Sequence, residues 1–147
     1  MAGNATTVLA FDFGLRRIGI AAGNTLTATA QPLVTLPTLE TGPDWDAIGR
    51  CMREWRPSAV VVGVPYNMDG STGSLTAPAQ AFAAELGSRF GVAVHEVDER
   101  LSSREAEEEL RRRRQTGELA RRVRRDDVDR EAACVLLRQW LNGPARG

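Results

Sequence analysis

Two hydrophobic patterns alternate along the chain, and their order predicts an α/β fold. Short runs rich in β-branched and aromatic residues predict strands, whereas apolar residues spaced three and four apart predict helices. Short turns link the first three runs, which indicates an antiparallel meander, and Pro32 favours an edge position for the third. The expected strands lie at 6–13, 17–23, 28–36, 59–65 and 92–97, and the expected helices at 44–55, 77–90, 103–114 and 128–141.

This order of elements predicts how the sheet is covered. The sequence β-β-β-α-β-α-β-α, with a charged helical segment before the last helix, predicts a five-stranded mixed sheet flanked by helices. The continuous apolar run at 59–65 is typical of a strand covered on both faces. Asp44 is the expected N-cap of the helix at 44–55. With 147 residues we expect a single domain over 1–147, with its core at about 7–141.

The composition restricts the class of protein but does not identify a binding partner. Basic and acidic residues balance at 19 each, and every basic residue is arginine, which fits either phosphate recognition or genomic composition. Cys51 and Cys134 are far apart, so we expect buried free thiols rather than a disulfide or a zinc site. The N-terminus lacks the pattern of a signal peptide, and no apolar run is long enough to span a bilayer. A soluble, cytoplasmic protein is expected.

Acidic residues fall where strands end and where the last helix begins. Asp12 ends the first strand, Asp98 and Glu99 follow the last strand, and Asp129 opens the last helix. Ligand sites of open α/β sheets lie outside the carboxyl ends of strands, so these acids are expected to converge there. Asp129 shares the apolar stripe of its helix, where a carboxylate is costly unless it is paired or bound to metal.

Each acid also has a structural explanation. Asp12 beside Gly14 fits a turn residue. Asp98 or Glu99 fits a partner of Arg100 or a helix cap, and Arg125 fits a partner of Asp129. The other two acids near the last helix, Asp126 and Asp127, each fit its N-cap.

Converging carboxylates with few histidines favour a hard divalent cation. Oxygen ligands suit Mg²⁺ or Mn²⁺ better than zinc, and two such ions roughly 3.5–4 Å apart assist in-line displacement at phosphorus. The lone histidine, His95, lies in an expected strand and is expected to pack or hydrogen-bond there.

Four segments resemble, in order, the motif blocks of the YqgF/RuvX family. They are AFDFGLRRIGIA, VVVGVPYNMDGS, VHEVDERLSS and VDREAACVLL, and the resemblance covers nearly the whole chain, from about Val8 to Leu141. It implies an RNase H-like fold related to Holliday-junction resolvases. Members are described as candidate nucleases that process the 5′ end of pre-16S ribosomal RNA during ribosome biogenesis. The family's acidic positions map onto Asp12, Glu99 and Asp129, which the resemblance makes the expected catalytic and metal-binding residues.

Polar residues beside these acids are candidates for nucleic-acid contact. The loop after the central strand carries Asn67, Asp69 and Gly70, which either shape the site or touch the nucleic-acid backbone. An Asx-turn at Asp69 is the structural alternative. The expected phosphate contacts are Arg16 and Arg17 in the first hairpin and Arg100 beside Glu99, although Arg100 also fits a partner of the acids.

One segment departs from the family pattern. Eight arginines lie between Arg111 and Arg125, followed by the acidic pair at 126–127. Such a basic segment suits phosphate contacts and strong salt dependence, or else a solvated helix paired with the glutamates at 107–109.

Three classes of function follow from these features. The first is a metal-dependent nuclease acting on a ribosomal RNA precursor, with Holliday junctions as the alternative substrate and ribosomal precursor particles as a further partner. An Asp-x-Gly after a first strand also opens the phosphate loop of actin-like ATPases, but those need a second such domain, for which this chain is too short. The third is a non-catalytic nucleic-acid-binding module, which predicts binding without metal dependence.

Overall fold

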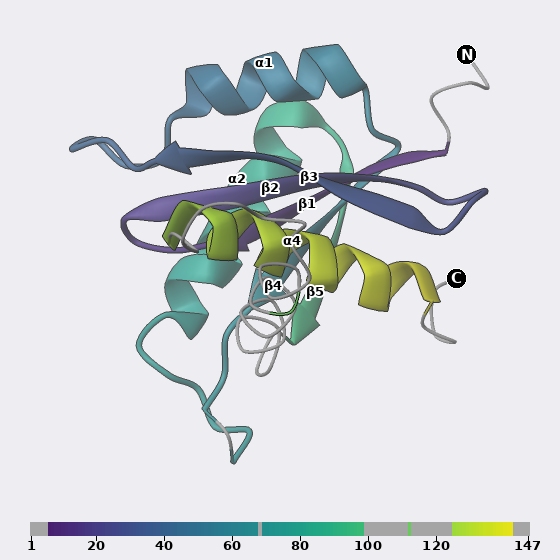
Figure 1. The fold of residues 1–147 in the computed structure, drawn as a ribbon. Coiled ribbons are helices and arrows are strands. Elements are labelled where there is room, and N and C mark those ends of the chain that lie inside the picture. The colour runs from purple at the N-terminus through teal and green to yellow at the C-terminus, as the bar shows by residue number, and fades with distance from the viewer. Residues whose placement is uncertain (1–5, 68, 99–111, 113–124, 143–147) are drawn as a thin grey trace.

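The computed structural model describes residues 6–67, 69–98, 112 and 125–142. Its elements follow the predicted order, as Figure 1 shows. The helix expected at 103–114 lies outside the described residues except for Arg112. The strands are β1 (Thr7–Phe13), β2 (Arg17–Asn24), β3 (Thr29–Pro37), β4 (Ala59–Val64) and β5 (Ala93–Asp98), and the helices are α1 (Trp45–Trp55), α2 (Thr76–Phe90) and α4 (Arg125–Asn142).

The five strands form one mixed sheet in the order β3-β2-β1-β4-β5. The first three strands pair antiparallel, which confirms the predicted meander, and β3, which contains Pro32, lies at an edge as predicted. β4 pairs in parallel with β1 on one side and with β5 on the other. The carboxyl ends of β1, β4 and β5 therefore lie side by side at the same end of the sheet.

Helices cover both faces of this sheet, and residue alternation along β1 separates two cores. Leu9 and Phe11 belong to the core that includes residues of α1 and α2. Val8 and Ala10 belong to the core beneath α4. Figure 1 shows α1 above the sheet and α4 along its opposite face. As predicted for a central strand, β4 is buried along almost its whole length.

Local sequence signals explain where α1 begins and ends. The side chain of Asp44 accepts a hydrogen bond from the N–H of Ala47 at 3.1 Å, which confirms the predicted N-cap. Arg56 then takes the left-handed conformation, with φ 44°, and Pro57 prevents the helix from continuing. Inside the fold, Trp45 stacks on Phe82 of α2 at 5.4 Å between ring centroids, so the two helices share one aromatic core.

Helix α4 packs closely on the meander. Ala133, Cys134 and Leu137 are fully buried against the sheet. At the point of contact a Cβ built on Gly23 of β2 would lie 2.7 Å from Cδ2 of Leu137 and 3.0 Å from the backbone oxygen of Thr29, so glycine favours this close approach of helix and strand. Helix α4 begins at Arg125, so the backbones of Asp126 and Asp127 lie within it rather than at the N-cap position predicted for either.

Candidate functional site at the carboxyl ends of the strands

Asp12 lies within β1 rather than in a turn. It pairs with Gly19 of β2 and with Gly63 of β4, and its side chain is only 9% exposed. Alternation places it on the face of Ala10, toward α4. Residues opposite each other on paired strands share a face, and both cross-strand neighbours of Asp12 lack side chains. No side chain from a directly opposite strand position therefore lies beside the carboxylate.

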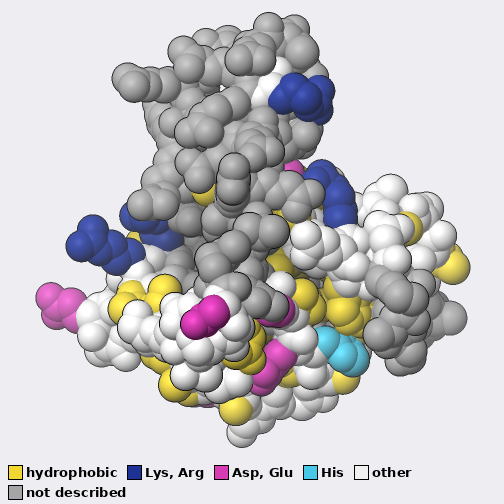
Figure 2. Space-filling model, turned by 90° about the horizontal axis from the view of Figure 1, so that it is seen from below, with side chains coloured by type: hydrophobic (Ala, Val, Ile, Leu, Met, Phe, Trp, Pro, Cys, Tyr) yellow, Lys and Arg dark blue, Asp and Glu magenta, His cyan; other side chains and the backbone are white. Residues whose placement is uncertain are grey.

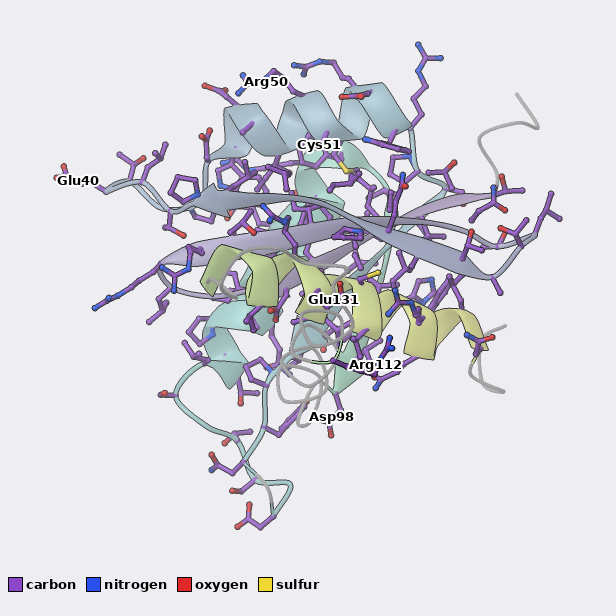
Figure 3. All side chains as sticks on the ribbon, viewed as in Figure 1. Glu40, Arg50, Cys51, Asp98, Arg112 and Glu131 are labelled. Atoms are coloured by element: carbon purple, nitrogen blue, oxygen red, sulfur yellow. The ribbon has the colours of Figure 1, made fainter. Side chains whose placement is uncertain are left out.

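Asp98 lies on the other face of the sheet. It pairs with Val64 at the end of β4, and alternation groups it with Val94 of β5, which packs toward α1 and α2. Figure 3 shows Asp98 pointing away from α4 at the end of β5. This register does not favour Asp98 as a ligand beside Asp12. Glu99 and Arg100 lie outside the described residues, so their roles stay predictions.

The backbone of Asp129 comes close to the level of Asp12. Leu137 of α4 lies against Gly23, four residues along β2 from Gly19, which corresponds to about 14 Å of strand. Asp129 precedes Leu137 by eight residues, or about 12 Å of helix. Since α4 lies along the strands (Figure 1), its first turns return toward the edge that carries Asp12. The side chain of Asp129 lies outside the described part of the chain.

Glycine keeps the hairpin beside Asp12 tight. A Cβ built on Gly14 would lie 2.7 Å from the backbone oxygen of Arg17, which real structures do not tolerate. The carbonyl oxygen of Arg16 accepts a hydrogen bond from the N–H of Thr38 at 2.8 Å, which ties the hairpin to the end of β3. The exposed Arg16 and the partly buried Arg17 therefore stand at the same edge as Asp12.

The change Gly14→Ala is expected to destabilise the protein by about 1–3 kcal/mol and to reduce any activity that depends on Asp12, because the backbone of the hairpin must move. Urea unfolding monitored by circular dichroism measures the loss. Gly42→Ala serves as a control for positive-φ strain without a steric contact, since nothing lies within 4 Å of its Cβ position. Equal stability of the Gly14 variant and the native chain would contradict the steric argument.

The loop between β4 and α2 is held by its own hydrogen bonds. Asp69 Oδ1 accepts from the N–H and the hydroxyl of Ser71 at 2.9 and 2.6 Å, which confirms the Asx-turn alternative for Asp69. The amide nitrogen of Asn67 donates to the Ser71 hydroxyl at 3.0 Å and to the carbonyl of Thr72 at 3.3 Å. Both side-chain N–H groups of Asn67 are thus used within the loop. This geometry favours a shaping role, and its contact with nucleic acid stays a prediction.

Two glycines and a threonine complete this loop. Gly70 takes a positive φ of 90°, and a Cβ on Gly73 would lie 3.0 Å from Oδ1 of Asn67, so both positions favour glycine. The buried hydroxyl of Thr76 donates to the carbonyl of Pro65 and accepts from the N–H of Gly73. The loop is therefore fixed to the start of α2 rather than loosely attached.

Glu131 is a buried acid that was not among the candidate residues predicted from the sequence. It is 1% exposed, and Nη1 of Arg138 donates to its Oε2 at 3.3 Å. A glutamate followed directly by Ala132, Ala133 and Cys134 was the available signal, because a charge among buried apolar residues needs a partner. Figure 3 places Glu131 at α4, the helix that also carries Asp129.

The thiols and the histidine behave as structural residues. Neither Cys51 nor Cys134 forms a disulfide; Cys134 is buried as predicted, whereas Cys51 is only partly buried. Burial, followed by the charge of Glu54, raises the pKa of the Cys51 thiol. Its thiolate, the reactive form, is therefore disfavoured. His95 lies on β5 with its ring 5.1 Å from that of Trp140. Within the part of the chain that the structure describes, no three His, Cys, Asp or Glu residues gather as a metal site, but Glu99 and the side chain of Asp129 are outside that part.

The fold defines the class to which the chain belongs. It is similar to the yeast mitochondrial Holliday junction resolvase Ydc2, with a TM-score of 0.58 at 7% identity over 94% of this chain and 78% of that one. It is also similar to Thermus thermophilus RuvC in complex with a Holliday junction substrate, with a TM-score of 0.51 at 20% identity over 89% and 91% of the two chains. The fold is that of the RNase H-like resolvases.

Sequence comparison gives the family within that class. Residues 6–143 match the model of the RuvX family, described as Holliday junction resolvase, and the chain belongs to this family. A relative from Pasteurella multocida is 47% identical over 92% of this chain and 94% of its own length. One from Burkholderia multivorans is 46% identical over 92% and 89%. Both are described as candidate pre-16S rRNA nucleases.

Among the residues that the structure describes, no helix has the length and apolar character needed to cross a membrane.

Proposed function

We propose that this protein is a metal-dependent nuclease that hydrolyses phosphodiester bonds of RNA, with the 5′ end of pre-16S ribosomal RNA as its substrate. The observation that carries the proposal is Asp12, a nearly buried carboxylate at a strand end whose cross-strand neighbours are both glycine. Family membership and the names of the relatives support the reaction class. Ribosome biogenesis in the cytoplasm is the corresponding setting.

The donor set suits a hard divalent cation. Asp12 offers carboxylate oxygens at a position whose two directly opposite residues are glycines, and Mg²⁺ or Mn²⁺ prefers such oxygen ligands. Glu99 and Asp129 are the proposed partners of Asp12 in holding one or two ions. When bound, such ions lower the pKa of a water molecule and stabilise charge on the phosphate oxygens.

The residues around Asp12 have proposed roles in binding. Arg16 and Arg17 at the hairpin, together with Arg100, hold the phosphates of the substrate, since guanidinium groups match phosphate geometry. Asn67 and Gly70 keep the neighbouring loop in shape, so that the nucleic-acid backbone approaches a rigid surface. Asp12 would hold the ion at the strand end, where it would face the reacting phosphate.

A four-way DNA junction is the second candidate substrate. The observation that favours it is the fold, which the chain shares with resolvase structures, together with the description of its family. Resolution of a junction requires two symmetric cuts, whereas RNA processing requires one.

One assay separates these candidates. The full chain is incubated with a pre-16S 5′-leader RNA and, in parallel, with a four-way DNA junction, each in the presence of Mg²⁺, Mn²⁺ or EDTA. Cleavage of the RNA alone that requires a metal ion supports the proposal. Cleavage of the junction alone replaces it with a resolvase. Binding of both substrates without cleavage by either ion would instead indicate a non-catalytic binding module.

A further inference from the structure

A hollow of about 340 Å³ opens at the ends of β4 and β5, the end of the sheet that also carries Asp12. Asp12 pairs with Gly63, and the next residue of β4, Val64, already lines this hollow. Alternation puts Val64, Glu96 and Asp98 on the face of α1 and α2, so this lining lies at the same strand ends as Asp12 but on the other face of the sheet. The volume of the hollow lies at the low end of ligand sites, which suits one planar ring rather than a duplex. The lining residues are Val64, Tyr66, Gly70, Glu96, Val97 and Asp98.

Tyr66 stands in this hollow on a fixed backbone. It pairs with Thr72 across the loop, and the adjacent N–H of Asn67 donates to the carbonyl of Ser71 at 2.9 Å. Its side chain is partly exposed and contacts no other aromatic ring among the described residues. The phenol hydroxyl has no hydrogen-bond partner in the described part of the chain. The ring thus belongs to neither hydrophobic core and offers a stacking surface on a fixed backbone.

The other side of the hollow is acidic. Glu96 and Asp98 stand two residues apart on β5 and therefore face the same way. Glu96 is exposed and forms no ion pair with any described residue. Figure 2, which looks onto the molecule from below, shows several separate acidic side chains and the histidine on this side of the molecule. Ionised carboxylates only accept hydrogen bonds, so they repel phosphate and select a group that presents donors.

We propose that the Tyr66 hollow is a base subsite that takes an unstacked guanine of the substrate strand, at the same strand ends as Asp12 but on the opposite face of the sheet. The base stacks on Tyr66, and its N1–H and N2–H₂ donors bind Glu96. Among the bases, guanine presents two adjacent donors along one edge, and unpaired bases are read by stacking and by such edges. The inference rests on the proposed function and makes it more specific, because it selects single-stranded RNA containing guanine.

Binding rather than cleavage tests this subsite. The full chain in EDTA is titrated with three labelled 11-mers: oligouridine, the same strand with one central guanosine, and the same strand with central inosine, which lacks the N2 amino group. We expect about tenfold tighter binding of the guanosine strand than of oligouridine, with inosine in between. Tyr66→Ala is expected to remove most of this gain, and Tyr66→Phe to keep it.

Glu96→Gln is the decisive variant. It is expected to make the affinities for the guanosine and uridine strands equal. Glu54→Gln, the same change on an exposed residue of α1, should leave the ratio of these affinities unchanged. The ratio matters because removal of any negative charge raises affinity for RNA in general. Equal binding of guanosine and uridine strands by the native protein, or an unchanged ratio in Glu96→Gln, would overturn the subsite. Since no metal or cleavage is needed, an active nuclease without guanine preference refutes only the subsite, and guanine preference without cleavage refutes only the proposed reaction.

Discussion

The change Asp12→Asn is expected to lower metal-dependent cleavage of the RNA substrate by about a thousandfold or more, because it replaces the proposed charged oxygen ligand by a neutral amide of the same shape. Folding should not suffer. Asp12 is only 9% exposed, and a neutral side chain costs less to bury there than a carboxylate. Single-turnover cleavage with saturating Mg²⁺ measures the rate, and thermal unfolding measures the stability.

A matched control separates this effect from a general loss of negative charge. Asp46→Asn makes the same change at an exposed position in the first turn of α1, on the far face of the sheet from α4. It is expected to leave the cleavage rate unchanged. If Asp12→Asn keeps the native rate at saturating Mg²⁺, Asp12 is not a metal ligand, whatever the protein binds.

The change Leu137→Ala is expected to destabilise the protein by about 2–5 kcal/mol, the usual range for a buried leucine. Leu137 is fully buried between α4 and the sheet, beside Gly23, where little can move to fill the cavity. Because α4 carries Asp129, cleavage should also fall at temperatures where the native protein is still fully active. Urea unfolding gives the free energy of unfolding from the midpoint and the slope of the transition.

Leu26→Ala is the control for this variant. Leu26 is 82% exposed in the turn between β2 and β3, so its truncation should change stability by less than about 0.5 kcal/mol. Similar losses for the two leucines would mean that α4 does not hold the fold together through this contact.

Much of the candidate site was predictable because it depends on local sequence. A β-branched and aromatic run places Asp12 in a strand, and the following Gly14 permits the tight hairpin. Asp129 on an apolar helix stripe is a similar local signal, and its side chain stays a prediction. For Asp69 the sequence fitted a structural turn and a contact with the nucleic-acid backbone equally well. The hydrogen bonds to Ser71 favour the turn.

The roles of Glu131 and Tyr66 could not be predicted from the sequence. The helical pattern predicts that α4 is widely buried, but the pairing of Glu131 with Arg138 two turns later is visible only when both side chains are placed. Tyr66 is one aromatic residue in a polar loop. Its neighbours in the hollow, Glu96 and Asp98, come from a strand about thirty residues later in the chain, so their proximity depends on the β4–β5 pairing.

The sequence by itself determined the order and type of the elements, the family, and the strand end that carries Asp12, because periodicity, turn residues and motifs act over short stretches of chain. Only the tertiary structure decided which face each acid occupies. The pairing of Asp12 with Gly19 and Gly63 and of Asp98 with Val64 puts these two acids on opposite faces of the sheet. Strand register sets side-chain direction, and a shift of one residue reverses it, so distant pairing rather than local pattern determines which groups meet.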